Sequence, residues 1–328
     1  MDATDGTVIG GGDTINGDGG ADELWGDASD TMTNAAGGND TINGGNGGDR
    51  IFGDADDMSG TSTGGNDTLN GDAGQDEISG DADTMGGSAS GGMDTINGRD
   101  DYDQLWGDAR DTMTGTATGG VDTIHGNDAI DVIFGEAQTM ESGTSGAGDT
   151  LFGDAARDKI YGEALTMIGA TGGDDTMYGG DEGDSNTGDS MYGEASEMNA
   201  GSIGGDDTMF GGTGRDFVLG DANRLYGNSS GGADTIQGDS GNDNVTGDAE
   251  YLGDVTIAGD SGFGGADTLI DGGAGNDIVY GDAKIMNGSS TGGNDVSIRG
   301  GDGVDAIYGD ARNMRDTSVG GDDVIDGG

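Results

Sequence analysis

The chain has 328 residues, including 78 Gly but no Pro or Cys, and only 30% of them are hydrophobic. That apolar fraction is too small for a conventional two-layer core, and the lack of cysteine excludes disulfides and thiolate metal sites. The formal net charge of −54, from 65 acids and 11 bases, excludes a basic surface for nucleic acid or anionic membranes and favours divalent cations. Such a composition is otherwise typical of disorder, so an ordered structure requires a strict repeat.

Residues 1–9 form a lead-in, and residues 10–328 form a single continuous repeat array of twelve copies, the last one truncated. The opening sequence MDATDGTVIG lacks the basic and apolar regions of a signal peptide, and no apolar run reaches transmembrane length. We therefore expect one domain, without membrane insertion.

Each copy opens with a nonad of the form G-G-x-D-T-I, in which an aspartate ends a glycine turn and an aliphatic residue follows two positions later. The spacing between successive aspartates is 26 to 33 residues, most often 27, with longer excursions near 181–186 and 253–264. These aspartates are Asp13, Asp40, Asp67, Asp94, Asp122, Asp149, Asp175, Asp207, Asp234, Asp267, Asp295 and Asp323.

The second nonad of each copy has the same form, and the third differs. The second-nonad aspartates are Asp22, Asp49, Asp76, Asp103, Asp131, Asp158, Asp189, Asp216, Asp243, Asp277 and Asp305. The third nonad opens G-D/E-A, with the acids Asp27, Asp54, Asp81, Asp108, Glu136, Glu163, Glu194, Asp221, Asp248, Asp282 and Asp310. A large apolar residue, usually Met, follows each of these acids four or five positions later.

Glycine turns that end in aspartate predict a metal site shared between neighbouring copies. Glycine allows positive φ and brings carbonyl oxygens close to one point, and calcium takes six to eight oxygens in flexible geometry. Because one turn supplies too few oxygens, an ion must lie between stacked turns, about 4.8 Å apart. The first- and second-nonad aspartates are therefore the predicted ligands, in two columns that hold on the order of twenty calcium ions. The third-nonad acids are candidate additional ligands, with exposure to water as the alternative.

The first two nonads resemble the glycine-rich nonapeptide G-G-x-G-x-D-x-U-x of the RTX (repeats-in-toxin, haemolysin-type) calcium-binding proteins. Full matches are GGNGGDRIF at 44–52 and GGAGNDIVY at 272–280. The resemblance implies an all-β fold, a right-handed parallel β-solenoid or β-roll, with about twelve rungs of about 27 residues. The third nonad departs from the two-nonad coil of the family. We favour a three-sided coil over a two-sided roll with a side loop.

Three apolar ladders are expected to face inward, because side chains alternate along a strand. The first contains Ile15, Ile42, Leu69, Ile96, Ile124 and Leu151, and the second contains Leu24, Ile51, Ile78, Leu105, Ile133 and Ile160. The third is the Met/Leu series Met32, Met58, Met85, Met113, Met140, Met167, Met198, Leu225, Leu252, Met286 and Met314, which suits a less regular corner.

Two outward rows have alternative explanations. Thr14, Thr41, Thr68 and Thr95 with Asn16, Asn43, Asn70 and Asn97 are similar to an ice-binding face, but exposed strands favour Thr, and stacked Asn side chains bond each other. The aromatic series is either a contact surface or packing over a thin sheet, and it comprises Trp25, Phe52, Trp106, Phe134, Tyr161, Tyr192, Tyr280 and Tyr308. No catalytic motif occurs, so no enzyme is expected, and the only histidine, His125, belongs to a surface ladder.

These features favour a calcium-binding structural or adhesive scaffold of an exported protein, such as a surface layer, filament, matrix or large adhesin segment. A carrier or secretion module of a secreted enzyme or toxin is the alternative, and ice binding is a lesser one. The resemblance implies export by type I secretion and a secreted or cell-surface location. Expected partners are calcium and, by end-to-end self-association, further copies or other surface and matrix components.

Overall fold

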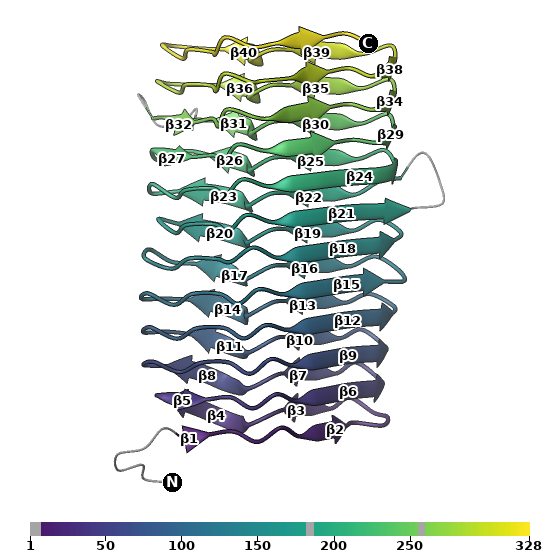
Figure 1. Ribbon diagram of the computed structural model, residues 1–328, viewed down its shortest axis with the longest axis vertical. Coiled ribbons are helices and arrows are strands. Elements are labelled where there is room, and N and C mark those ends of the chain that lie inside the picture. Colours follow the sequence, from purple (N-terminus) through teal and green to yellow (C-terminus); the bar gives the residue numbers. More distant parts are fainter. Residues whose placement is uncertain (1–7, 182–186, 255–259) are drawn as a thin grey trace.

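The structure, a computed structural model, describes residues 8–181, 187–254 and 260–328. Within these residues all secondary structure is β, so no helix could span a membrane. Residues 1–7 of the predicted lead-in and much of both predicted excursions lie outside the described residues. Coils are stacked along one axis, with β1 (Val8–Ile9) at one end and the C-terminus at the other (Figure 1). The predicted parallel β-solenoid is confirmed.

Three long parallel sheets run along the rod, one for each nonad of the copy. The first-nonad sheet contains β2 (Thr14–Asn16), β6 (Thr41–Asn46), β9 (Thr68–Ala73), β12 (Thr95–Asp100), β15 (Thr123–Asn127), β18 (Thr150–Ala155), β21 (Thr176–Asp181), β24 (Thr208–Gly214), β28 (Thr235–Gln237), β33 (Leu269–Asp271), β37 (Ile298–Arg299) and β41 (Ile325–Asp326), with β29 (Ser240–Gly241), β34 (Ala274–Gly275) and β38 (Asp302–Gly303) beside them. The second-nonad sheet contains β3 (Glu23–Trp25), β7 (Arg50–Phe52), β10 (Glu77–Ser79), β13 (Gln104–Trp106), β16 (Val132–Phe134), β19 (Lys159–Tyr161), β22 (Ser190–Tyr192), β25 (Phe217–Leu219), β30 (Asn244–Thr246), β35 (Ile278–Tyr280) and β39 (Ala306–Tyr308).

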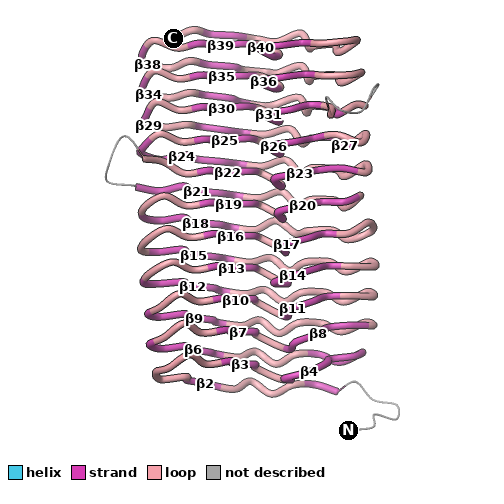
Figure 2. Tube along the Cα trace, turned by 180° about the vertical axis from the view of Figure 1, so that it is seen from behind, coloured by secondary structure: helices cyan, strands magenta, loops and turns pink. Residues whose placement is uncertain are grey.

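The third-nonad sheet contains β4 (Ala28–Thr33), β8 (Ala55–Ser59), β11 (Ala82–Met85), β14 (Ala109–Met113), β17 (Ala137–Met140), β20 (Ala164–Ile168), β23 (Ala195–Asn199), β26 (Ala222–Leu225), β31 (Ala249–Leu252), β36 (Ala283–Met286) and β40 (Ala311–Met314). Two short pairs, β1 (Val8–Ile9) with β5 (Ala35–Ala36) and β27 (Ser229–Ser230) with β32 (Gly262–Phe263), complete the strands. Figure 2 shows the rod from behind, with the same coil repeated along its length.

Residues at the same position in successive copies pair with each other in the sheets. Ile96 pairs with Leu69 on one side and with Ile124 on the other, one repeat away in each direction. Because side-chain direction has a period of two, this register holds each aliphatic ladder on the inner face of its sheet. All three predicted ladders are buried along the rod except in its terminal coils.

The apolar interior is divided into two clusters. Ladders one and two pack against each other, from Ile42 to Ile298, between the first- and second-nonad sheets. The Met/Leu ladder packs separately, against alanines such as Ala82 and Ala117, beside the third-nonad sheet. The coil therefore has three long sheets but two separate apolar lobes. It differs in this from the favoured three-sided coil, because the Met/Leu ladder packs against alanines and not against the other two ladders.

The tip of the Met/Ala lobe is closed by hydrogen bonds of the chain itself. The Ser62 hydroxyl donates to Ser59 O at 2.8 Å, and Thr144, Ser202 and Ser290 make the same bond to the residue three positions earlier. Other copies have Ala89, Ala117 or Ala170 at this buried position. A small side chain, Ser, Thr or Ala, is therefore buried at this position in each of these copies.

The aromatic series lies in a corner between the second- and third-nonad sheets and is mostly buried. Phe52, Trp106, Phe134, Tyr161, Tyr192 and Tyr280 are between 1% and 7% exposed, and Trp25 and Tyr308 in the terminal coils are half-buried. Ion pairs cross this corner: Arg110 on β14 contacts Glu77 on β10 at 2.9 Å and lies over the Phe52 ring. A contact surface requires accessible rings, so packing accounts for the six buried aromatic residues.

The outer row of the first-nonad sheet confirms the prediction that the asparagines bond each other. Asn43, Asn70 and Asn97 each donate an amide hydrogen to the asparagine of the preceding coil, at 2.9 to 3.1 Å. Beyond them His125 stacks on Phe152 with ring centroids 4.3 Å apart, and its Nδ1 lies 2.9 Å from Asp154 Oδ2. His125 is thus part of the surface ladder.

Candidate metal centre

The first-nonad aspartates line up where the two apolar lobes meet. From Asp40 to Asp295 each is at most 2% exposed. Each Oδ1 accepts a hydrogen bond from the backbone N–H of the preceding aspartate in the row, at 2.5 to 3.1 Å, as Asp94 does from Asp67. The other oxygen, Oδ2, is buried without a hydrogen-bond partner among the described residues from Asp40 to Asp295.

The second-nonad aspartates form a similar row at the turn that joins the first- and second-nonad sheets. Asp49 to Asp277 are at most 3% exposed, and each Oδ1 accepts from the backbone N–H one coil earlier. Within the described chain, the Oδ2 atoms of Asp49, Asp76 and Asp103 also have no hydrogen-bond partner. We call this row, Asp22 to Asp305, the end row.

The third-nonad acids lie directly across the coil from the first-nonad aspartates. From Asp54 to Asp282 they are fully buried, at 0% exposure. Each accepts a hydrogen bond from a backbone N–H of the following first-nonad turn, such as Gly65 N–H to Asp54 Oδ2 at 2.9 Å and Gly232 N–H to Asp221 Oδ1 at 2.8 Å. The first-nonad aspartates and third-nonad acids together form what we call the waist.

Glycines shape the space beside these carboxylates. A Cβ on Gly80 would overlap Gly107 O and Asp94 Oδ2, and a Cβ on Gly71 would overlap Asp76 Oδ2 and crowd Gly98 O. Carboxylate and carbonyl oxygens therefore face the same small space in successive coils. Only glycine leaves that space open.

Isolation from water disfavours the charged form of these carboxyls. Burial, with repulsion from Asp94 and Asp108, raises the pKa of Asp81 well above its usual range, and burial likewise raises that of Glu163. In the end row burial raises the pKa of Asp76 to about 6 and of Asp103 to about 8. Rows of buried acids need either protons or cations, since an unpaired buried charge is costly.

The donor set fits calcium. Carboxylates and glycine carbonyls are hard oxygen ligands, and calcium accepts them in irregular arrangements. No point in the described chain gathers three His, Cys, Asp or Glu side chains. Glycine carbonyls lie beside the carboxylates, as Gly107 O and Asp94 Oδ2 do at Gly80. Sequence reasoning named the carboxylates of both rows. It did not identify the individual carbonyls, such as Gly107 O, although the glycine before each third-nonad acid is a signal for them.

Acids in the terminal coils are less enclosed. Asp22, Asp27, Asp305, Asp310 and Asp323 are half-buried, and Asp13 is exposed, because each has neighbouring coils on one side only. The predicted ligands are therefore brought together fully in the middle of the rod and incompletely at its ends.

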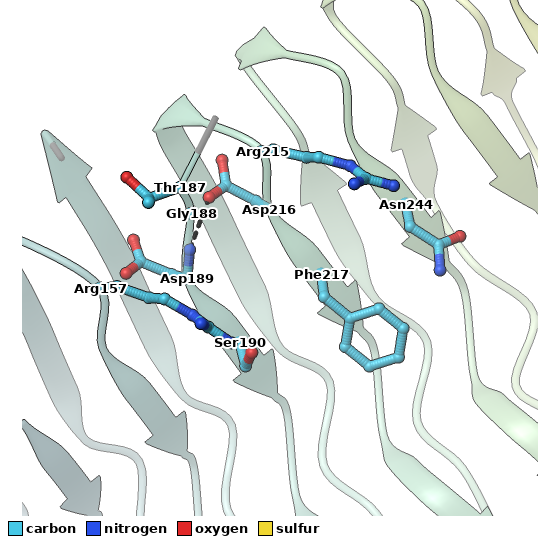
Figure 3. A pocket seen from close by; sticks show the side chains of 9 residues that line it. All are labelled: Arg157, Thr187, Gly188, Asp189, Ser190, Arg215, Asp216, Phe217 and Asn244. Carbon is cyan, nitrogen blue, oxygen red and sulfur yellow. Dashed lines mark hydrogen bonds between the residues drawn. The ribbon is translucent and has the colours of Figure 1, made fainter. Parts of the chain in front are cut away.

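A cavity of about 320 Å³ reaches the end row. Figure 3 shows Asp189 and Asp216 aligned in consecutive coils, with the Asp189 N–H donating to Asp216 Oδ1 at 2.8 Å. Arg157 and Arg215, both exposed, line this cavity together with Gly188. The cavity thus borders the end row at this position, although Asp189 and Asp216 are themselves each 1% exposed.

A parallel β-solenoid with files of buried carboxylates and glycine carbonyls is a cation-binding repeat protein. The chain matches the RTX calcium-binding nonapeptide repeat (4 copies) over residues 9–30, 34–57, 61–84, 88–117, 116–139, 144–164, 203–229, 220–250 and 264–283. It belongs to this family, whose repeats bind Ca²⁺. No curated protein matches it significantly.

Gly107→Ala is predicted to remove one or two bound calcium ions and to disorder only the adjacent coils. The new Cβ would overlap Gly135 O and Asp122 Oδ2, while repeat stability is shared among neighbours. Calorimetric calcium titration measures the loss. Gly19→Ala is the control, since its Cβ comes no closer than 3.7 Å to Asn46 O. A full calcium complement in the Gly107 variant would contradict the site.

Without calcium, the β-structure is predicted to depend on pH. Burial raises the pKa of Asp67 to about 7 and that of Asp103 to about 8, from an ordinary 3.8. Folded-state pKa values above the unfolded ones stabilise the fold at acid pH, and this stability is lost as pH rises through about 6 to 8. Circular dichroism in chelator should show β-signal near pH 4 that disappears by pH 8. A pH-independent signal would contradict the prediction.

Proposed function

We propose that the chain is a calcium-dependent structural or adhesive segment of an exported protein, rigid only when calcium is bound. The observation that carries the proposal is the burial of carboxylates along the rod, from Asp40 to Asp295 and from Asp49 to Asp277. A solenoid interior of this kind has no stable charge balance without cations. Calcium is then part of the fold.

Export fits this dependence. Extracellular calcium modules bind with Kd values of about 10⁻⁴ to 10⁻³ M, so the chain would stay unfolded at low intracellular calcium and fold outside. Export is typical of the family. A rod of twelve coils at about 4.8 Å would be roughly 58 Å long, a suitable element for a surface layer, matrix or adhesin.

Chelation should unfold the chain at neutral pH. The 54 excess negative charges repel one another, and the two small apolar lobes do not offset that repulsion. Circular dichroism should show disorder in chelator and β-structure in millimolar calcium. Magnesium is the control cation, because it demands near-ideal octahedral geometry and is expected to substitute poorly. Equal β-signal with and without calcium would overturn the proposal.

We propose further that calcium-ordered rods associate end to end. Among the described residues, the strands at the two ends of the sheets, such as β4 and β40, pair on one side only, and Met314 and Ile325 on the last coil are 44% and 51% exposed. Unpaired parallel edges are templates for another coil of the same register. A second copy would extend all three apolar ladders and all three rows of acids.

Light scattering and electron microscopy during calcium addition test the association. The expected result is calcium-triggered growth of rods, reversed by chelator. Calcium-ordered chains that remain monomeric at high concentration would rule out the association and favour the carrier of a secreted enzyme or toxin.

A further inference from the structure

We propose that the third-nonad acids are calcium ligands and that the rod has two classes of calcium site. In the waist each ion is held by carboxylates of the first and the third nonads, and these ions bind first and most tightly. Ions of the end row are held by one row of carboxylates and bind more weakly. This inference rests on the proposed calcium-dependent fold, and it departs from the two-nonad motif, which has no third acid.

The two acid rows of the waist contact each other's backbone reciprocally. The first-nonad aspartates Asp94 and Asp122 lie against the third-nonad glycines Gly80 and Gly107, respectively. The third-nonad Asp108 lies against the first-nonad glycine Gly91, and both its oxygens accept from the Gly120 N–H, at 2.9 and 3.1 Å. The first-nonad aspartates thus face the glycines of the third nonad, and the third-nonad acids face the glycines of the first. One ion between the two rows can therefore contact carboxylates of both.

The third-nonad carboxylates are also oriented like ligands. In most copies one oxygen is fixed by a backbone N–H, as Glu136 Oε1 is by Ala147 at 2.5 Å. The second oxygen is buried without a hydrogen-bond partner among the described residues at Glu163, Glu194 and Asp282. Elsewhere neighbouring third-nonad carboxyls lie against each other, as those of Asp54 and Asp81 do. A surface acid would turn this oxygen to water. These acids are 0% exposed and cannot.

The waist sites and the end-row sites differ in the number of carboxylates that each coil contributes. Each coil adds two carboxylates to the waist, which one Ca²⁺ neutralises, in a region closed to water. The end row adds one carboxylate for each coil. Further acids of this turn are exposed or half-buried, unlike the fully buried third-nonad acids, and they do not keep one position from coil to coil. They are Asp18, Asp72, Asp100, Asp101, Asp128, Asp154, Asp181, Asp239 and Asp302.

The surroundings of the end row weaken it further. Cavities of about 320 and 210 Å³ open beside it, at Asp189 and Asp216 and at Asp22 and Asp49. Arg157 and Arg215 border the first of these cavities (Figure 3), and their charges disfavour a cation at the adjacent end-row positions. Calcium titration should therefore have two phases, with about eleven ions in the tight phase and about ten in the weak one.

Three variants of one coil test the assignment: Asp108→Asn in the waist, Asp103→Asn in the end row, and the control Asp111→Asn, an exposed acid of the same coil. Asp108→Asn should remove one or two ions from the tight phase or weaken them by about tenfold or more, the scale expected when a metal site loses a supporting carboxylate. Asp103→Asn should change only the weak phase. Asp111→Asn should change neither.

Glu163→Gln, with the exposed Glu141→Gln as control, repeats the test in another coil, so local misfolding of one variant does not decide the outcome. The unaltered chain could bind calcium and fold, while Asp108→Asn and Glu163→Gln show the same calcium titration as their controls. That result would overturn the inference and leave the proposed function intact. A single-phase titration would overturn the ordering of the two classes. No calcium binding by the unaltered chain would instead reject the proposed function itself.

Discussion

The constraint on which this structure depends is the burial of rows of carboxylates, for whose oxygens we propose a cation as partner. Rows of aspartate and glutamate occupy positions that apolar residues fill in most solenoids, and their unpaired oxygens are directed into glycine-lined spaces. The short turns and the glycine content follow from this demand, because carbonyls and carboxylates of successive coils must converge on one ion. The many carboxylates, whose mutual repulsion would otherwise keep the chain unfolded, are in this proposal the ligands of the cations.

The two apolar lobes lie on either side of the waist. Neither is a sizeable core, since a coil contributes one aliphatic side chain from each of the first two nonads and one Met or Leu with small alanines from the third. Stability therefore comes from stacking many equal coils, as in other solenoids. Aromatic residues fill the corner between two sheets and are covered by ion pairs such as Arg110 with Glu77, so that corner is closed without metal.

The repeat length, the three sheets and the inward ladders could be predicted from the sequence, because periodicity determines which residues stack on one another. It does not determine which rows face each other across a coil. Asp81 lies in a third nonad and Asp94 in the first nonad that follows it, on opposite sides of the coil. The sequence does not show that the two sides approach closely enough for these carboxyls to be neighbours, as the structure does. Phe52 follows the inward-facing Ile51, so the sequence left open whether its ring is a contact surface or packing. The chain bends between two sheets at this point, and the ring is buried as packing.

The most direct test of the account is a crystal structure of the calcium-bound chain with anomalous scattering measured from calcium. The account predicts two files of anomalous peaks along the rod. One lies in the waist between the first-nonad aspartates and the third-nonad acids, as between Asp94 and Asp108, and the other lies along the end row. Peaks confined to the outer surface, with the waist carboxylates protonated and paired to each other, would contradict it.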